Sequence, residues 1–249
     1  MRIIISPAKK MRTDEDSFAP EGLPRFLDRT ERLLSALRAM EPRALQALWK
    51  CNDAIAALNV ERLRTMDLRR HLTPALLSYE GLQYQYMAPG VFEAGELDYV
   101  RERLRILSGF YGLLRPFDGV VPYRLEMQAR LTADGFRDLY GFWGGALAEA
   151  LAAETELVVD LASREYSRAV TPHLPSSVRC LACVFGEERD GKIVEKGSLC
   201  KMARGEMVRF LAADGADRAE DLRDFTGLGY RFSPARSTED RYVFIKGGT

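Results

Sequence analysis

The hydrophobic pattern divides the chain into strand-like ends and a helix-like middle. Strands are predicted from short runs rich in apolar and β-branched residues. These runs are residues 2–5, 156–162, 178–185, 192–199, 230–232 and 241–245. The first run stops at Ser6-Pro7, which is typical of a buried strand entering a loop. Asp190-Gly191 predicts a hairpin turn between the third and fourth runs.

Between these ends, apolar residues recur every three or four positions, a spacing that predicts helices. The predicted helices are residues 24–42, 43–51, 54–58, 60–66, 75–87, 95–107, 139–153 and 201–213. Asn52-Asp53 is interpreted as a turn or cap, and Asn59 as the cap of the helix after it. Short helices joined by tight turns at about residues 42–66 suggest a helix-hairpin-helix, which presents backbone amides to a phosphate. A small helical subdomain without DNA is the alternative.

Strands at both ends with helices between them predict a mixed α/β (α+β) fold. The sequence shows no long-period repeat, low-complexity tract or linker. A chain of 249 residues is long enough to bury a sizeable core. We therefore expect one compact domain over residues 1–249, with a mixed sheet from the N- and C-terminal strands and an inserted helical region.

Residues 104–127, LRILSGFYGLLRPFDGVVPYRLEM, combine apolar side chains with turn-forming Gly and Pro. The spacing of Leu104 and Leu107 predicts the end of a helix that stops at Ser108-Gly109. The remainder predicts a buried, irregular segment that presents a few charges to a cleft. The alternative is a long hairpin packed on the core, with its charges in solvent.

Composition narrows the classes of function. Lys plus Arg and Asp plus Glu number 36 each, so the net charge is zero and any nucleic-acid binding requires a local cluster of cations. The 47% hydrophobic and 29% charged content is typical of a soluble globular protein. No run approaches the roughly 18 apolar residues of a membrane span, and the apolar N-terminal segment is too short for a secretory signal. We expect a cytoplasmic protein with no membrane partner.

The cysteines and histidines favour neither redox chemistry nor a metal site. Cys180 and Cys183 form a Cys-X-X-Cys pair inside a predicted strand, which directs the two side chains to opposite faces. A redox pair instead needs its first sulfur at a helix N-terminus. With only His71 and His173 besides two distant cysteines, a tetrahedral site lacks ligands at suitable spacing. The chain also lacks the glycine-rich loops of ordinary nucleotide sites. No metal or cofactor is predicted.

The remaining candidates are charged residues at turns and strand ends. The cations are Lys9, Lys10, Arg115, Arg124, Lys201 and Arg204, and the carboxylates are Glu126, Asp160 and Glu165. In one interpretation the cations bind DNA phosphates, helped by Asn52, Asn59 and Arg62 of the hairpin region. In the other, Lys9 with Glu126 or Asp160 forms an acid/base pair for a small phosphorylated or nucleobase-like substrate, with Ser108 and Arg124 nearby. A scaffold protein with an exposed apolar patch is a third alternative.

Several long motifs occur in an order that resembles the YaaA peroxide-stress proteins. They are IISPAK (residues 4–9), YEGLQY (79–84), the stretch 104–127, LYGFWG (139–144), LASREY (161–166), KMARGEMVRF (201–210) and GYRF (229–232). The resemblance extends almost from end to end.

The resemblance implies a cytoplasmic protein of the hydrogen-peroxide response that limits oxidative damage by lowering free intracellular iron. It also implies an unusual mixed α/β fold that binds DNA duplexes and junctions. The hairpin would be residues 42–66, and the cations of a positive cleft would be Lys9, Arg115, Arg124, Lys201 and Arg204. Two departures reduce the local charge: Leu82-Gln83 replaces an Asp-Val of some relatives, and Lys201-Met202 replaces a Lys-Lys pair. We expect the effect on iron to be indirect, because soft and imidazole ligands are scarce and unspaced.

Overall fold

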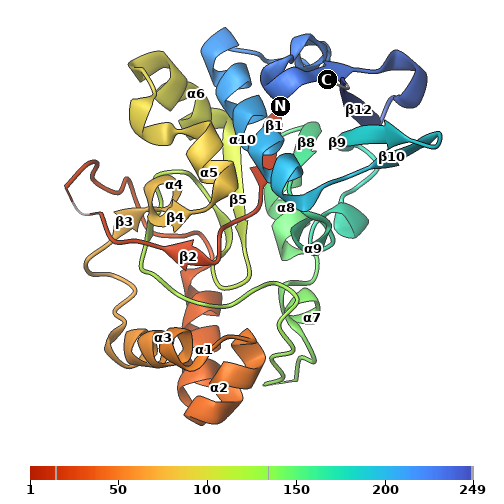
Figure 1. Cartoon of the computed structure of the whole chain (residues 1–249). Helices are drawn as coiled ribbons and strands as arrows, with labels where there is room; N and C mark the ends of the chain where they lie inside the picture. The colour runs from red at the N-terminus through yellow and green to blue at the C-terminus, as the bar shows by residue number, and fades with distance from the viewer. Residues whose placement is uncertain (15, 134, 248–249) are drawn as a thin grey trace.

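A computed structural model describes residues 1–14, 16–133 and 135–247. Its main sheet has eight strands from both ends and the middle of the chain (Figure 1). They are β1 (Arg2–Ile5), β5 (Leu104–Ser108), β6 (Gly112–Leu114), β8 (Leu157–Leu161), β9 (Arg179–Arg189), β10 (Lys192–Val194), β11 (Tyr230–Phe232) and β12 (Arg241–Lys246).

The strand order is β11-β12-β9-β8-β1-β5-β6, with β10 paired to β9. Pairs between β5, β1, β8, β9 and β12 are parallel, whereas β6, β10 and β11 are antiparallel to their neighbours. In the central strand β1, Arg2 is followed by three fully buried residues, Ile3, Ile4 and Ile5, which is typical of a strand that is covered on both faces. The predicted mixed α/β fold class is confirmed.

Two small two-stranded sheets connect loops that surround the main sheet. One pairs β2 (Lys10–Met11) with β4 (Tyr79–Glu80), and the other pairs β3 (Thr73–Pro74) with β7 (Gly119–Val120). The first of them fixes the loop after β1 against the segment that enters α5.

Along the sequence, most of the described helices lie between β2 and β5, and others come just before or just after β8. They are α1 (Leu27–Arg38), α2 (Pro42–Trp49), α3 (Asp53–Thr65), α4 (Ala75–Ser78), α5 (Leu82–Met87), α6 (Ala94–Arg103), α7 (Leu139–Trp143), α8 (Ala146–Ala152), α9 (Arg164–Ser167) and α10 (Gly197–Asp214). Short 3-10 turns occupy Pro89–Val91, Thr171–His173, Ala219–Asp224, Gly227–Gly229 and Pro234–Arg236. Helices α1 to α3 form a group below the sheet in the view of Figure 1.

The helical region at residues 42–66 differs from the prediction in one respect. Residues 53–65 form a single helix, so the predicted cap at Asn59 is wrong. Asn59 is buried within α3 and its Nδ2 donates to Ile55 O, whereas Asn52 caps the helix by accepting from Ile55 N. A short turn joins α2 to α3. That this pair is a DNA-binding helix-hairpin-helix stays a prediction.

The predicted helix over residues 95–107 is also wrong at its end. Helix α6 stops at Arg103, and Leu104–Ser108 is strand β5, parallel to β1. All five strand residues are buried, and Arg105 is accommodated by an ion pair with Glu154 at 2.6 Å. A short apolar run fits either structure, and here pairing with the central strand decides between them.

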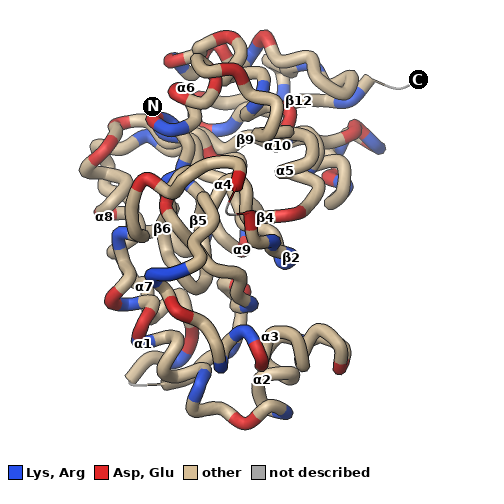
Figure 2. The backbone as a smooth tube through the Cα atoms, turned by 90° about the vertical axis from the view of Figure 1, so that its left-hand side faces the viewer, with Lys and Arg blue, Asp and Glu red and all other residues tan. Residues whose placement is uncertain are grey.

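Residues 109–127 combine both interpretations made for them. β5 and β6 form a hairpin on the core, and a buried irregular segment then runs from Val121 to Met127. The two parts cross closely, because a Cβ at Gly109 would lie 2.6 Å from Leu125 O. Within this segment Arg124 and Glu126 turn toward a cavity. Basic and acidic residues are interspersed along the whole backbone (Figure 2).

Candidate functional site

The main cavity lies where the chain leaves two adjacent parallel strands in opposite directions. In the sheet, β1 lies between β8 and β5. The chain passes from β1 to β5 on one side, whereas it passes from β8 to β9 on the other side. Loops that diverge in this way open a crevice at the carboxyl ends of the strands. A cavity of about 480 Å³ occupies this position, and the segments after β1 and β8 both line it. Its volume is in the range of ligand-binding pockets.

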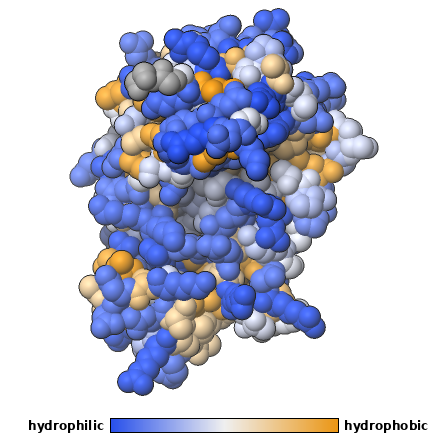
Figure 3. Space-filling view, turned by 45° about the vertical axis from the view of Figure 1, so that its right-hand side comes forward, coloured by the Kyte–Doolittle hydropathy of each residue, from blue (hydrophilic) through white to orange (hydrophobic). Residues whose placement is uncertain are grey.

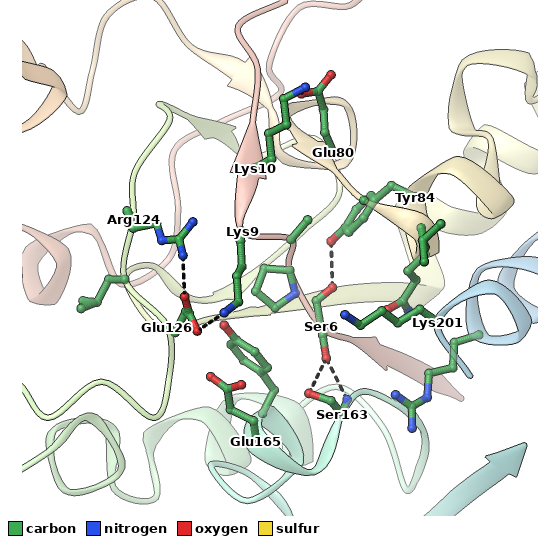
Figure 4. Close-up of a pocket in the computed structure, with 18 of the residues that line it drawn as sticks. Ser6, Lys9, Lys10, Glu80, Tyr84, Arg124, Glu126, Ser163, Glu165 and Lys201 are labelled. Carbon is green, nitrogen blue, oxygen red and sulfur yellow. Dashed lines mark hydrogen bonds and ion pairs between the residues drawn. The ribbon is translucent and has the colours of Figure 1, made fainter. Parts of the chain in front are cut away.

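Hydrogen bonds between the two diverging loops shape the floor of the cavity. Ser163 N donates to Ser6 Oγ at 2.8 Å, so the exits of β8 and β1 are tied together (Figure 4). Tyr84 of α5 reaches the same place and donates its hydroxyl to Ser6 O at 3.0 Å. These contacts fix the backbone from which Lys9 and Glu165 extend.

One side of the cavity carries a bridged set of charges. Lys9 Nζ lies 2.7 Å from Glu126 Oε2, and Arg124 Nη2 lies 3.1 Å from Glu126 Oε1. Lys10 Nζ lies 2.8 Å from Glu80 Oε2, across the β2–β4 pair. Glu126 is largely buried, whereas Lys9 keeps 64% of its side chain exposed. Lys9 can therefore meet a second anion at the mouth of the cavity.

The other side presents Lys201 and Arg204 from α10, and Figure 4 shows Lys201 opposite Lys9 and Arg124. Among the described residues, Lys201 Nζ has no hydrogen-bond or ion-pair partner. Arg204 Nη2 lies 3.7 Å from Glu195, a looser ion pair than that of Lys9.

Three buried donors that line this cavity have no partner in the described part of the chain. They are Gln83 Nε2, Arg124 Nε and Arg204 Nε. Buried polar atoms are nearly always hydrogen-bonded, so unpaired ones call for a ligand or water. All three are donors, so the atoms that satisfy them must be acceptors. A phosphate or carboxylate meets that requirement.

Glu165 adds a second carboxylate with a different environment. Burial raises its pKa, and the nearby Glu126 raises it further, whereas the N–H of Gln128 and the charge of Lys9 lower it. Glu126, by contrast, takes part in two ion pairs, with Lys9 and with Arg124. Carboxylates with such different surroundings can serve as an acid and a base.

The structure brings together most of the predicted cations but not every candidate. Lys9, Lys10, Arg124, Lys201 and Arg204 all line the cavity, together with Glu126. The predicted residues outside its lining are Asn52, Asn59, Arg62, Arg115, Ser108 and Asp160. Arg115 is exposed on the turn after β6, and Arg62 donates to Met11 O and to Asn59.

Ser108 and Asp160 support the cavity from behind its lining. The Ser108 hydroxyl accepts from Phe110 N and Tyr111 N and lies 2.7 Å from the Tyr123 hydroxyl. Asp160 accepts from Ala162 N and from Ser167 Oγ, which holds the loop that carries Ser163 and Glu165. Burial raises the pKa of Asp160.

Sequence reasoning did not select several residues that line the cavity. They include Ser6, Glu80, Gln83, Tyr84, Ser163 and Tyr166. A usable signal was present for the two serines, because both follow buried parallel strands at their carboxyl ends. No local pattern separated the buried Gln83 from an ordinary exposed helix residue.

The surroundings of the cysteines and of the possible metal ligands can be described in the same way. Cys180 and Cys183 lie in β9, and burial raises the pKa of Cys180 to about 12. The described residues contain no cluster of His, Cys, Asp and Glu suited to hold a metal ion. None of their helices has the length and apolarity required to cross a membrane.

The described large apolar side chains on the surface are dispersed. They are Phe18, Leu23, Ile55, Leu58, Val91 and Val194. The face in Figure 3 is mostly hydrophilic, with hydrophobic residues in small separate groups. A polar ligand therefore fits the molecule better than an apolar docking partner.

The fold and cavity define a mixed α/β protein with a cation-lined site at the carboxyl edge of a parallel sheet. Comparison with known proteins identifies the family to which the chain belongs. The family model described as peroxide stress protein YaaA matches residues 1–236, and the chain belongs to this family. The predicted resemblance is confirmed.

Bacterial relatives match over nearly their whole length. The UPF0246 protein of Desulfitobacterium hafniense is 48% identical over 246 residues, which are 99% of this chain and 98% of the relative. The UPF0246 protein of Lactiplantibacillus plantarum is 49% identical over 245 residues, with 98% of this chain and 99% of the relative covered. Membership of this family supports a role in the peroxide stress response.

Proposed function

We propose that this protein acts in the cytoplasm during peroxide stress and binds DNA, as a duplex or a junction, through the cation-lined cavity. The observation that carries the proposal is the convergence of Lys9, Lys10, Arg124, Lys201 and Arg204 from separate segments of a chain without net charge. The buried donors without partners on Gln83, Arg124 and Arg204 further support a ligand that offers acceptor atoms. DNA phosphates supply both the charge and the acceptors.

Binding at increasing salt tests this proposal. The logarithm of the affinity for a labelled duplex or junction should fall linearly with the logarithm of the salt concentration. Lys201→Gln should reduce that slope by about one unit, because it removes one phosphate contact and breaks no ion pair. Lys192→Gln is the matched control, since Lys192 is an exposed lysine outside the cavity. Arg115→Gln tests whether the interface extends to the turn after β6.

An interaction that is absent, or insensitive to salt, would end the DNA proposal. So would equal slopes for the Lys201 variant and its control.

The second candidate is an enzyme that acts on a small phosphorylated or nucleobase-like substrate in the same cavity. Its support is the volume of about 480 Å³ together with the Glu126 and Glu165 pair beside Lys9. Chromatography after incubation with deoxynucleoside monophosphates would detect a product. Turnover that Glu126→Gln and Glu165→Gln each abolish would support an enzyme, and the absence of any product would leave binding as the function of the cavity.

The lowering of free iron is proposed to be indirect, through protection of DNA or an unknown reaction. The support is the scarcity of soft and imidazole ligands in the sequence. Anaerobic titration with ferrous iron should show no tight stoichiometric site. A site of one iron per chain with micromolar or tighter affinity would overturn this view.

A further inference from the structure

The charges that line the main cavity do not balance. Among the described residues of its lining, five are cations and three are carboxylates, so the lining carries two more positive than negative charges. The cations are Lys9, Lys10, Arg124, Lys201 and Arg204, and the carboxylates are Glu80, Glu126 and Glu165. The whole chain, in contrast, has no net charge. The excess is therefore a local property of the cavity, and a small anion would neutralise it.

The excess charge belongs to cations on both sides of the cavity. Glu126 is shared by Lys9 and Arg124, at 2.7 and 3.1 Å, so one carboxylate faces two cations. Lys201 has no hydrogen-bond or ion-pair partner among the described residues. Figure 4 shows Lys201 on the side opposite Lys9 and Arg124. A single anionic group between the two sides can therefore contact cations from both.

Unpaired donors on the lining side chains favour an anion that offers acceptor atoms. Gln83, Arg124 and Arg204 line the cavity, and each has a buried donor without a partner in the described part of the chain. Arg204 also has only a loose ion pair, at 3.7 Å, with Glu195, which lies outside the lining. A phosphate monoester supplies three acceptor oxygens and a charge of about −1.5 to −2 near pH 7, which matches the excess. A phosphodiester carries one negative charge.

The rest of the lining suits a flat, uncharged group. Tyr84, Tyr123 and Tyr166 line the cavity together with Leu82 and Leu125. The hydroxyls of Tyr84 and Tyr123 are already hydrogen-bonded inside the protein, so these residues offer ring surface to a ligand. Aromatic rings of this kind stack on nucleobases of any sequence. The volume of about 480 Å³ is in the range of sites that enclose a molecule of this size.

From these features we infer that the cavity binds a nucleoside monophosphate as a free small molecule, and that it selects the phosphate monoester over a phosphodiester. This inference rests on the second candidate function and names its substrate class. The phosphate lies between Lys201 and the pair formed by Lys9 and Arg124, and the base lies on the aromatic part of the lining. It is independent of DNA binding, because the internal phosphates of DNA are diesters.

Isothermal titration calorimetry with five ligands at one pH and one salt concentration tests the inference. The reference is deoxyadenosine 5′-monophosphate. Its 3′,5′-cyclic form keeps the base and sugar but is a diester. Deoxyadenosine lacks the phosphate, 2-deoxyribose 5-phosphate lacks the base, and inorganic phosphate lacks both base and sugar.

The 5′-monophosphate should bind at least about tenfold more tightly than the cyclic diester, because it brings more charge and a further terminal oxygen to the cations. It should also bind about tenfold more tightly than 2-deoxyribose 5-phosphate and inorganic phosphate, since only the nucleotide has a base to stack on the tyrosines. Deoxyadenosine should bind most weakly of the ligands that carry a base.

One variant assigns the selection to the cations. Lys201 is exposed and has no ion pair to lose, so Lys201→Gln should leave folding unchanged. It should lower the affinity for the 5′-monophosphate at least about fivefold and that for the cyclic diester less, because the lost lysine contacts the more highly charged group more strongly. Lys192→Gln removes an exposed lysine outside the cavity and should keep both affinities.

The outcomes separate the inference from the function beneath it. Equal affinity for the 5′-monophosphate and its cyclic form, or for the 5′-monophosphate and deoxyadenosine, overturns the selection of a monoester and leaves a nucleobase-like ligand for the second candidate function. A sugar phosphate or inorganic phosphate that binds as tightly as the nucleotide overturns the role of the base and leaves a small phosphorylated ligand. Failure of all five to bind overturns the inference together with the second candidate function.

Discussion

At the scale of single residues, buried hydroxyl and carboxyl groups hold the cavity wall in shape. The Ser108 hydroxyl is the clearest case, because it accepts two backbone N–H groups and also contacts the Tyr123 hydroxyl, all in the interior. Tyr123 contacts Tyr79 in turn at 2.9 Å, so one hydroxyl chain joins the β5–β6 hairpin to the wall of the cavity. The charged side chains of the cavity depend on this uncharged network.

Ser108→Ala should destabilise the protein by roughly 2–4 kcal/mol, because it leaves two buried N–H groups without an acceptor, at roughly 1–3 kcal/mol each. Urea denaturation measures the loss. Ser35→Ala is the control, since the Ser35 hydroxyl is exposed and bonds only within its own helix. A Ser108 variant as stable as the control would show that water replaces the hydroxyl.

Asp118 should give the protein a dependence of stability on pH. Burial raises its pKa from 3.8 to about 6, against the lowering effects of the Arg115 N–H and charge. The folded state therefore binds this proton more tightly than the unfolded state, so stability falls as the pH rises from about 4 to about 6. Between about pH 4.5 and pH 7, Asp118→Asn should lose less stability than the wild type, by on the order of 2 kcal/mol. Identical pH profiles would contradict the assignment.

At the scale of elements, the cavity depends on how closely α10 approaches α5. Gly205 makes that approach possible, because a Cβ there would lie 2.0 Å from Gln83 O and 2.9 Å from Met87 N. Gln83 on α5 and Lys201 and Arg204 on α10 line the cavity on either side of this contact. The spacing of the two helices therefore sets the spacing of the ligand-binding side chains.

Gly205→Ala should cost about 1–3 kcal/mol or more, since the added methyl group must push two backbones apart. It should also weaken DNA binding, because Lys201 and Arg204 move with α10. Gly197→Ala is the matched control at the start of the same helix, where no atom lies near the added methyl group. If both variants keep wild-type stability and affinity, the tight packing of α10 on α5 does not control the site.

The sequence predicted correctly those elements whose local hydrophobic pattern indicates the same secondary structure that packing in the folded protein favours. The strand at residues 2–5 and the helix at residues 201–213 are confirmed within a few residues, because each has one clear pattern along its length. Residues 104–107 were predicted as the end of a helix, since their spacing fits a helix and only the neighbouring β1 makes them part of a strand. The same limit applies to the site. Lys9 and Arg124 follow recognisable turn signals in the sequence, but Gln83 becomes a candidate only through its unpaired buried atom.

At the scale of the whole molecule, the position of α1 to α3 raises the question of whether they fold with the sheet. The contacts indicate that they do. Thr30 of α1 is fully buried and donates its hydroxyl to Phe110 O at the turn of the β5–β6 hairpin. Arg29 donates to Trp143 O. One hydrophobic cluster also contains Leu33, Trp49 and the strand residues of β1.

The chain should therefore unfold as a single unit, and its two tryptophans allow a direct test. Trp49 lies in α2, and Trp143 donates to Gly109 O beside the sheet, so Trp143→Phe and Trp49→Phe each leave one reporter in one part of the molecule. In urea, each variant should give a fluorescence midpoint that coincides with its own far-ultraviolet circular dichroism midpoint, because a shared core couples the helices to the sheet. A Trp49 signal that changes well before the circular dichroism would show that α1 to α3 unfold separately.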